Sequence, residues 1–104
     1  MEQRIIIAIT TFSNEDSAVS CSRNLIPKNL VACAQVSGPI RSFYQWESKI
    51  LEDQEWRLVL KFSGSNERVV REEVMKSHEY DSPQWIYWDA DTNESYGKWV
   101  NAEG

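Results

Sequence analysis

Residues 30–62 read LVACAQVSGPIRSFYQWESKILEDQEWRLVLKF, a stretch that decides the fold because it predicts two long strands that fold back on each other. Every second residue from 56 to 62 is large and apolar, and the charged residues Arg57 and Lys61 stand between them. A period of two is typical of a strand that buries one face. The second half of the stretch is therefore predicted to lie on a hydrophobic core.

The first half of the same stretch contains Gly38-Pro39, a pair that predicts a bulge or a bend within a strand. A strand of about fifteen residues spans on the order of 50 Å. A domain of this size has a radius of gyration of about 13 Å. The hairpin is therefore predicted to overhang its own domain and to be covered by another copy of the chain.

The segments outside the hairpin each predict one element from their apolar spacing and from capping or helix-breaking residues. They are a strand over 4–11, a helix that starts at 13–16 and stops near 27–29, a helix over 67–78 after a turn at 63–66, a strand over 84–88 and a short helix over 95–100.

This order, βαββαβ with a terminal helix, predicts an α+β fold of the ferredoxin-like split βαβ class in one domain over 1–104. Two helices are expected to cover one face of a four-stranded antiparallel sheet. The other face is expected to be buried by oligomerisation.

Composition narrows the classes of function. The chain has 104 residues and a net charge of −5 without a basic stripe, which argues against nucleic acid as a partner. Its apolar run at 5–9 is too short for a membrane span or a signal peptide. We therefore expect a cytoplasmic location, and in that reducing compartment Cys21 and Cys33 are predicted to be buried thiols rather than a disulfide bridge.

Four motifs resemble those of the CutA family, the divalent-cation tolerance proteins. They are TTFSNEDSA near the first strand, the 30–62 stretch, SHEYDSPQWI and YGKWVN. The resemblance implies a compact homotrimer in which long hairpins wrap around neighbouring sheets. It also implies a non-enzymatic function connected with copper or another divalent cation, which would be bound near clefts between subunits.

The resemblance also suggests metal-binding positions. In the family pattern a cysteine near the end of the first strand, the histidine of a His-Pro-Tyr-x-x-Pro-Glu motif and an acid are candidate copper ligands. Here those positions hold Thr10, His78 and Gln84. With two of three replaced, the metal candidates become His78 and the adjacent Glu79. The alternative for His78 is a histidine at a helix end that interacts with the helix dipole.

A second candidate site involves Lys61, Tyr80 and Trp46, which are predicted to line a cleft between subunits that binds a small anion. The alternative for Lys61 is a solvated side chain on an exposed strand face. The acids at 52, 53 and 55 are a candidate cluster for weak binding of hard cations, and the alternative is a solvated hairpin.

Several other functions are less well supported. Residues 89–93, DADTN, resemble the opening of a calcium loop. Such a loop needs glycine at position six and glutamate at position twelve, and here these are Glu94 and Val100. An acidic loop that caps the last helix is expected instead. No P-loop or Ser/His/Asp set is present, and a thiol enzyme requires Cys33 to meet His78. The remaining rivals are a PII-like trimeric nucleotide sensor and an acylphosphatase-like hydrolase, for which the first loop is unexpectedly acidic.

Overall fold

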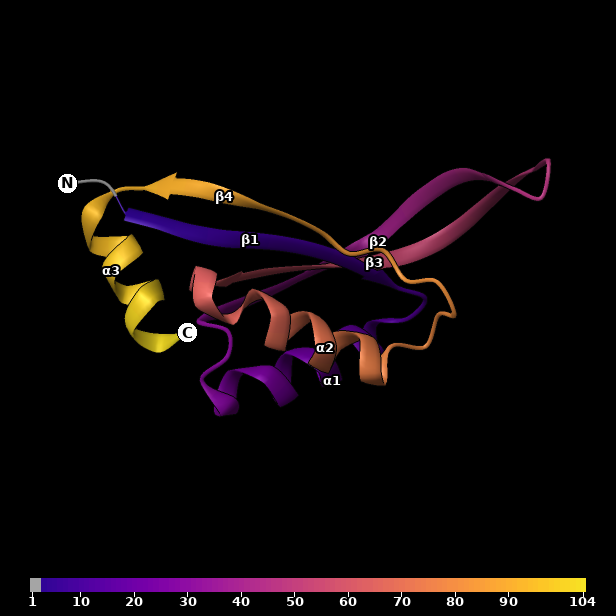
Figure 1. The fold of residues 1–104 in the computed structure, drawn as a ribbon. Coiled ribbons are helices and arrows are strands. Elements are labelled where there is room, and N and C mark those ends of the chain that lie inside the picture. The colour runs from indigo at the N-terminus through magenta and orange to yellow at the C-terminus, as the bar shows by residue number, and fades with distance from the viewer. Residues whose placement is uncertain (1–2) are drawn as a thin grey trace.

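The computed structural model describes residues 3–104 and contains the predicted order of elements (Figure 1). The elements are β1 (Gln3–Phe12), α1 (Glu15–Leu25), β2 (Cys33–Trp46), β3 (Lys49–Phe62), α2 (Glu67–Ser77), β4 (Ile86–Thr92) and α3 (Glu94–Glu103), with short 3₁₀ turns at Ile26–Lys28 and Gly64–Asn66. The strands form one antiparallel sheet in the order β2-β3-β1-β4. The α+β split βαβ fold is confirmed.

Helices α1 and α2 lie side by side on one face of the sheet (Figure 1). The period-two pattern predicted this face correctly, because Leu58, Leu60 and Phe62 of β3 are completely buried beneath the helices. Alternate residues of β1 join them, and so do apolar side chains of both helices. The core members from these elements include Ile6, Ala8, Leu25, Val70 and Val74.

Both helices begin where the sequence predicted, but only α1 has a side-chain cap at its start. Asn14 caps α1, since its side chain accepts a 2.8 Å hydrogen bond from the Ser17 amide. Asn66 precedes α2 but does not cap it. Its side-chain amide instead donates to the carbonyl oxygens of Leu30 and Gly104, at 3.2 and 3.1 Å. Asn66 therefore ties the end of α3 to the start of the hairpin.

The long hairpin bends where the sequence predicted it. The pairing of β2 with β3 shifts between Ser37 and Ile40. A Cβ atom at Gly38 would lie 2.5 Å from Cδ1 of Trp56, so the glycine leaves room for the indole ring. Because β1 pairs with β3 only as far as Trp56, residues 40–55 extend beyond the sheet as a two-stranded ribbon (Figure 1).

This ribbon, residues 40–55, is the overhang expected from the sequence. The molecule measures 48 × 24 × 22 Å. At the end of the ribbon, Glu47 and Ser48 both have positive φ angles, 50° and 65°. Large apolar side chains are exposed along it, including Phe43 at 64%, Trp46 at 56% and Ile50 at 76%. Burial of these side chains by further copies of the chain stays a prediction.

The second face of the sheet is not wholly open, because α3 covers part of it. Gly97 packs against Gln3 and Thr92, and Val100 and Ile5 are buried. Ile5 lies on the face opposite to that of Ile6, so α3 sits across the sheet from α1 and α2. The expectation that only another subunit could cover this face was therefore wrong at this end. Toward the ribbon the face stays uncovered, and Ile86 and Trp88 are exposed there.

The last strand also differs from the prediction. It begins at Ile86 rather than residue 84 and continues to Thr92. The acids at 89–93 were expected to form a loop, but Asp89 and Asp91 pair with Ile6 and Arg4 of β1. Only Asn93 precedes α3. Among residues 3–104, no helix is both long and apolar enough to cross a membrane.

Candidate functional site

His78, the retained histidine, lies directly after α2 and packs against β1. Its ring stacks on Phe12 with 4.3 Å between centroids and 10° between planes. Nδ1 accepts a 3.1 Å hydrogen bond from the Tyr80 amide, so Nε2 carries the proton and donates to Thr10 Oγ1, also at 3.1 Å. Burial lowers the pKa of His78 more than the Thr11 carbonyl and nearby carboxylates raise it. The imidazole is therefore a neutral group with both nitrogens engaged, rather than a cation at the helix end.

Glu79 points to a different element, the start of α1. Its carboxylate accepts hydrogen bonds from the backbone amide of Ser13, the Ser13 hydroxyl at 2.8 Å, the side-chain Nδ2 of Asn14 at 3.2 Å and the Ser17 hydroxyl at 3.3 Å. Partial burial acts to raise the pKa of Glu79, but the hydrogen bonds from Ser13 and Ser17 outweigh it, so the pKa lies below its ordinary value. Glu79 thus supplies negative charge to the positive end of α1.

These residues do not fit a copper ion. Thr10 and His78 are hydrogen-bonded to each other, the Glu79 carboxylate is bound at the start of α1, and the exposed Gln84 lies in a groove that His78 does not line. Copper selects imidazole and sulfur donors, and a threonine hydroxyl replaces neither. Within residues 3–104, no three His, Cys, Asp or Glu side chains are grouped so that they could hold a metal ion.

The separate groove runs between the ribbon and residues 79–84 and has a volume of about 740 Å³. Two of the three residues predicted for a cleft, Tyr80 and Trp46, line it. Lys61 does not, because it pairs with Ile7 nearer the other end of the sheet, where its Nζ lies 5.5 Å from the Tyr96 ring centroid. One subunit therefore brings together only part of the predicted cleft.

The groove is acidic and partly aromatic. Its carboxylates are Asp53, Glu55, Glu79 and Asp81. The Tyr80 hydroxyl donates a 2.7 Å hydrogen bond to Glu55. The pKa of Tyr80 is raised, mainly by burial and to a smaller extent by this hydrogen bond. Glu79 is engaged at the start of α1, but three other acidic residues and no lysine or arginine line the groove, so it suits a positively charged ligand better than an anion.

The predicted cluster of acids at 52, 53 and 55 is divided by the alternation of the strand. Asp53 accepts from the Tyr44 hydroxyl on the groove side. Glu52 points the other way and pairs with Arg41. The sequence did not predict that Glu55 contacts Tyr80 or that Asp53 contacts Tyr44. It did indicate that Asp53 and Glu55 share a face, because residues two apart in a strand point to the same side.

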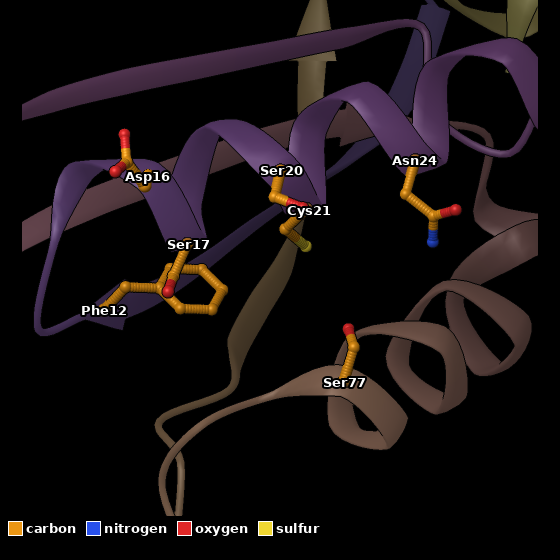
Figure 2. Close-up of a pocket in the computed structure, with 7 residues that line it drawn as sticks. All are labelled: Phe12, Asp16, Ser17, Ser20, Cys21, Asn24 and Ser77. Carbon is orange, nitrogen blue, oxygen red and sulfur yellow. The ribbon is translucent and has the colours of Figure 1, made fainter.

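A second cavity of about 590 Å³ lies between α1 and α2. Figure 2 shows the side chains of Asn24 and Ser77 pointing into the space between the two helices, with Cys21 on α1 beside them. Burial raises the pKa of the Cys21 thiol to about 11, so little thiolate exists near neutral pH. The Cys21 thiol is therefore not an activated nucleophile.

The geometry also argues against a thiol enzyme built on the other cysteine. Cys33 pairs with Lys61, whereas His78 packs on Phe12, which pairs with Trp56. In residues 3–104, no hydrogen bond joins His78 to a cysteine. Both cysteines are free, as the sequence predicted.

Comparisons with known proteins agree with the fold. A family model described as CutA1 divalent ion tolerance protein matches residues 6–103. The divalent-cation tolerance protein CutA of Pyrococcus horikoshii is 38% identical over 100 residues, covering 95% of this chain and 97% of the relative. The corresponding protein of Thermotoga maritima is 37% identical over 79 residues, covering 76% and 77%.

A solved structure supports the same family. The crystal structure of the divalent ion tolerance protein CutA1 from Ehrlichia chaffeensis has a TM-score of 0.90 and 29% identity, covering 98% of this chain and 95% of that chain. These relatives are named as tolerance proteins rather than as enzymes, and the matches do not favour a PII-like sensor. The chain therefore belongs to the CutA family of divalent-cation tolerance proteins.

Proposed function

We propose that this chain acts as a homotrimeric, non-enzymatic CutA protein in the cytoplasm and binds a small ligand in grooves that neighbouring subunits complete. The observation that carries the proposal is the ribbon. Within residues 3–104, no third strand lies beside residues 40–55, and Phe43, Trp46 and Ile50 are exposed to 56–76%. Large apolar side chains exposed together on one segment of a soluble protein mark an interaction surface.

A neighbouring subunit offers a matching apolar surface. Ile86 and Trp88 are exposed on the part of the sheet that α3 leaves uncovered. Packing the ribbon of one copy against this region of the next would bury both. Repeated around a closed ring, such a head-to-tail contact gives a cyclic oligomer, and the family resemblance implies that the ring has three members.

The groove between the ribbon and residues 79–84 is the proposed ligand site. Its acidic lining favours a cation, and divalent cations are the first class to test. Because no three metal-binding side chains are grouped within residues 3–104 of one subunit, a metal site there would need groups from a second subunit. The small anionic ligand expected from the sequence stays a prediction, and the charge of the groove does not favour it.

Light scattering coupled to size-exclusion chromatography tests the assembly. The wild type should elute with three times the mass of one chain at micromolar concentration. Ile50→Asp places a charge on the ribbon and should shift the population toward monomers, whereas Glu103→Gln, on α3 far from the ribbon, should leave the mass unchanged. A folded wild-type monomer under these conditions would refute the assembly.

Calorimetric titration tests the ligand class with Mn²⁺, Zn²⁺ and Cu²⁺ in parallel with phosphate and ATP. A cation should bind, and Glu55→Gln should weaken it about tenfold, because a carboxylate near the ligand is lost. Glu103→Gln is the matched control for the charge change. Binding of the anions alone, or equal cation affinities in wild type and Glu55→Gln, would contradict the proposal.

A further inference from the structure

Residues 78–84 have no regular secondary structure and form most of the loop that connects α2 to β4. Three consecutive side chains at its start reach three different elements. His78 contacts β1, Glu79 contacts the start of α1, and the Tyr80 hydroxyl contacts Glu55 on β3. The start of this loop is therefore fixed to three elements other than the two that it connects.

We infer that His78 and Glu79 form a two-point latch that holds the 78–84 loop in place as one wall of the groove, and that they do so instead of binding a metal ion. The name latch refers here to two sets of contacts: His78 with Thr10, Phe12 and the Tyr80 amide, and Glu79 with Ser13, Asn14 and Ser17. The inference rests on the proposed function only in taking this wall as part of a ligand groove.

The first point of the latch leaves no free coordination position on the histidine. A metal at Nε2 would displace the hydrogen bond to Thr10, and a metal at Nδ1 would displace the Tyr80 amide. At either nitrogen, metal binding would break a partly buried hydrogen bond, and the free-energy cost of that loss opposes metal binding. One ring face is also covered by Phe12. The histidine is therefore committed to fixing the backbone at Tyr80.

The second point of the latch joins the loop to a helix end. The Glu79 carboxylate accepts from four donors near the N-terminus of α1, where a negative charge is favourable. Because Glu79 lies between His78 and Tyr80, both points restrain the same short backbone segment. Tyr80 is then held where its hydroxyl meets Glu55 inside the groove.

Amide hydrogen exchange, measured residue by residue by NMR on the full chain, tests the first point. Thr10→Val keeps the shape of the side chain but removes the acceptor of the His78 hydrogen bond, and His78→Phe keeps the stacked ring but removes both hydrogen bonds. Each should accelerate exchange of the Tyr80 amide about fivefold or more. Thr10→Ser retains the hydroxyl and should restore slow exchange.

Glu79→Gln tests the second point and should accelerate exchange of the Ser13 amide by a similar factor. Glu15→Gln is its matched control, since Glu15 lies in the first turn of α1 and is exposed. It removes one negative charge from the same helix end without altering a loop contact. Equal exchange at Ser13 and Tyr80 in wild type, Thr10→Val and Glu79→Gln would overturn the latch, and Thr10→Val serves as the test if His78→Phe does not fold.

A Cu²⁺ titration followed by electron paramagnetic resonance separates the latch from a metal site. The latch predicts the same spectrum and affinity for wild type and His78→Phe. A nitrogen-coupled signal that disappears in His78→Phe would overturn the inference. These outcomes are independent of trimer mass and of Glu55-dependent binding, so a failure of the proposed function and a failure of the latch can be told apart.

Discussion

Gly97 is the position at which adding a single methyl group should have the clearest effect on stability. It is buried in α3 where this helix crosses β1 and β4. A Cβ atom built there would lie 2.2 Å from both Gln3 Cβ and Thr92 Oγ1, and 2.9 Å from Gln3 Cγ. We predict that Gly97→Ala weakens the docking of α3.

Two opposing effects set the magnitude. Alanine is favoured over glycine inside a helix by about 1 kcal/mol. Carbon atoms in contact prefer separations of about 3.5–4.0 Å, so α3 must move by more than about 1 Å to relieve the clash. Overpacking of a closed site destabilises by about 1–3 kcal/mol, and a contact with Gln3 Cβ, which is fixed to the backbone, belongs at the upper end. The net loss should be about 2 kcal/mol.

Thermal and urea unfolding followed by circular dichroism measure this loss. About 2 kcal/mol corresponds to a drop of roughly 10 °C in Tm for a domain of this size. Gly64→Ala is the matched control, because the nearest atom to its added Cβ lies 4.0 Å away, and its Tm should change little. Variants are compared at one protein concentration, since the proposed assembly would make stability depend on concentration. A Gly97→Ala protein as stable as the wild type would refute the reasoning.

Three further predictions concern acid stability, the hairpin turn and the thiols. Because folding lowers the pKa of His78, the unfolded chain binds a proton more readily than the folded chain. The free energy of unfolding should therefore fall as pH decreases from 6.5 through the folded pKa. In urea unfolding, the free energy of unfolding of His78→Phe should change less over this pH range. Ser48→Gly should raise the free energy of unfolding by about 1 kcal/mol, because Ser48 has φ of 65° at the hairpin turn, and an unchanged urea midpoint would contradict this. A colorimetric thiol reagent at pH 8 should modify partly exposed Cys33 well before buried Cys21, whose pKa is about 11; equal rates would show that the helix pair opens freely.

The sequence predicted the hairpin and the covered sheet face because period-two alternation reports burial directly. Leu58, Leu60 and Phe62 were assigned to the core for this reason, and they are fully buried. Strand β4 was placed too early because its second half alternates with acids. Asp91 is tolerated there since β4 is an edge strand and Arg4 forms a 3.2 Å ion pair with it. Local composition could not reveal that partner on another strand.

The candidate site was harder to predict, because its contacts join distant parts of the chain. The position of His78 followed from a motif, but its partner Thr10 lies 68 residues away. Glu79 and Ser13 are separated by 66 residues. A motif indicates which side chains are candidates, whereas only the packing of α2 against β1 and α1 shows that these two are occupied by hydrogen bonds.

The face-to-face stack of His78 on Phe12 also gives the protein a natural spectroscopic label. The chain has one histidine, and a benzene ring held 4.3 Å away shields the carbon-bound protons above it. Its imidazole resonances should therefore appear upfield of those of a free histidine, as one isolated set per subunit. Threefold symmetry would preserve a single set, while inequivalent subunits would split it, so one proton spectrum reports both the loop and the symmetry of the particle.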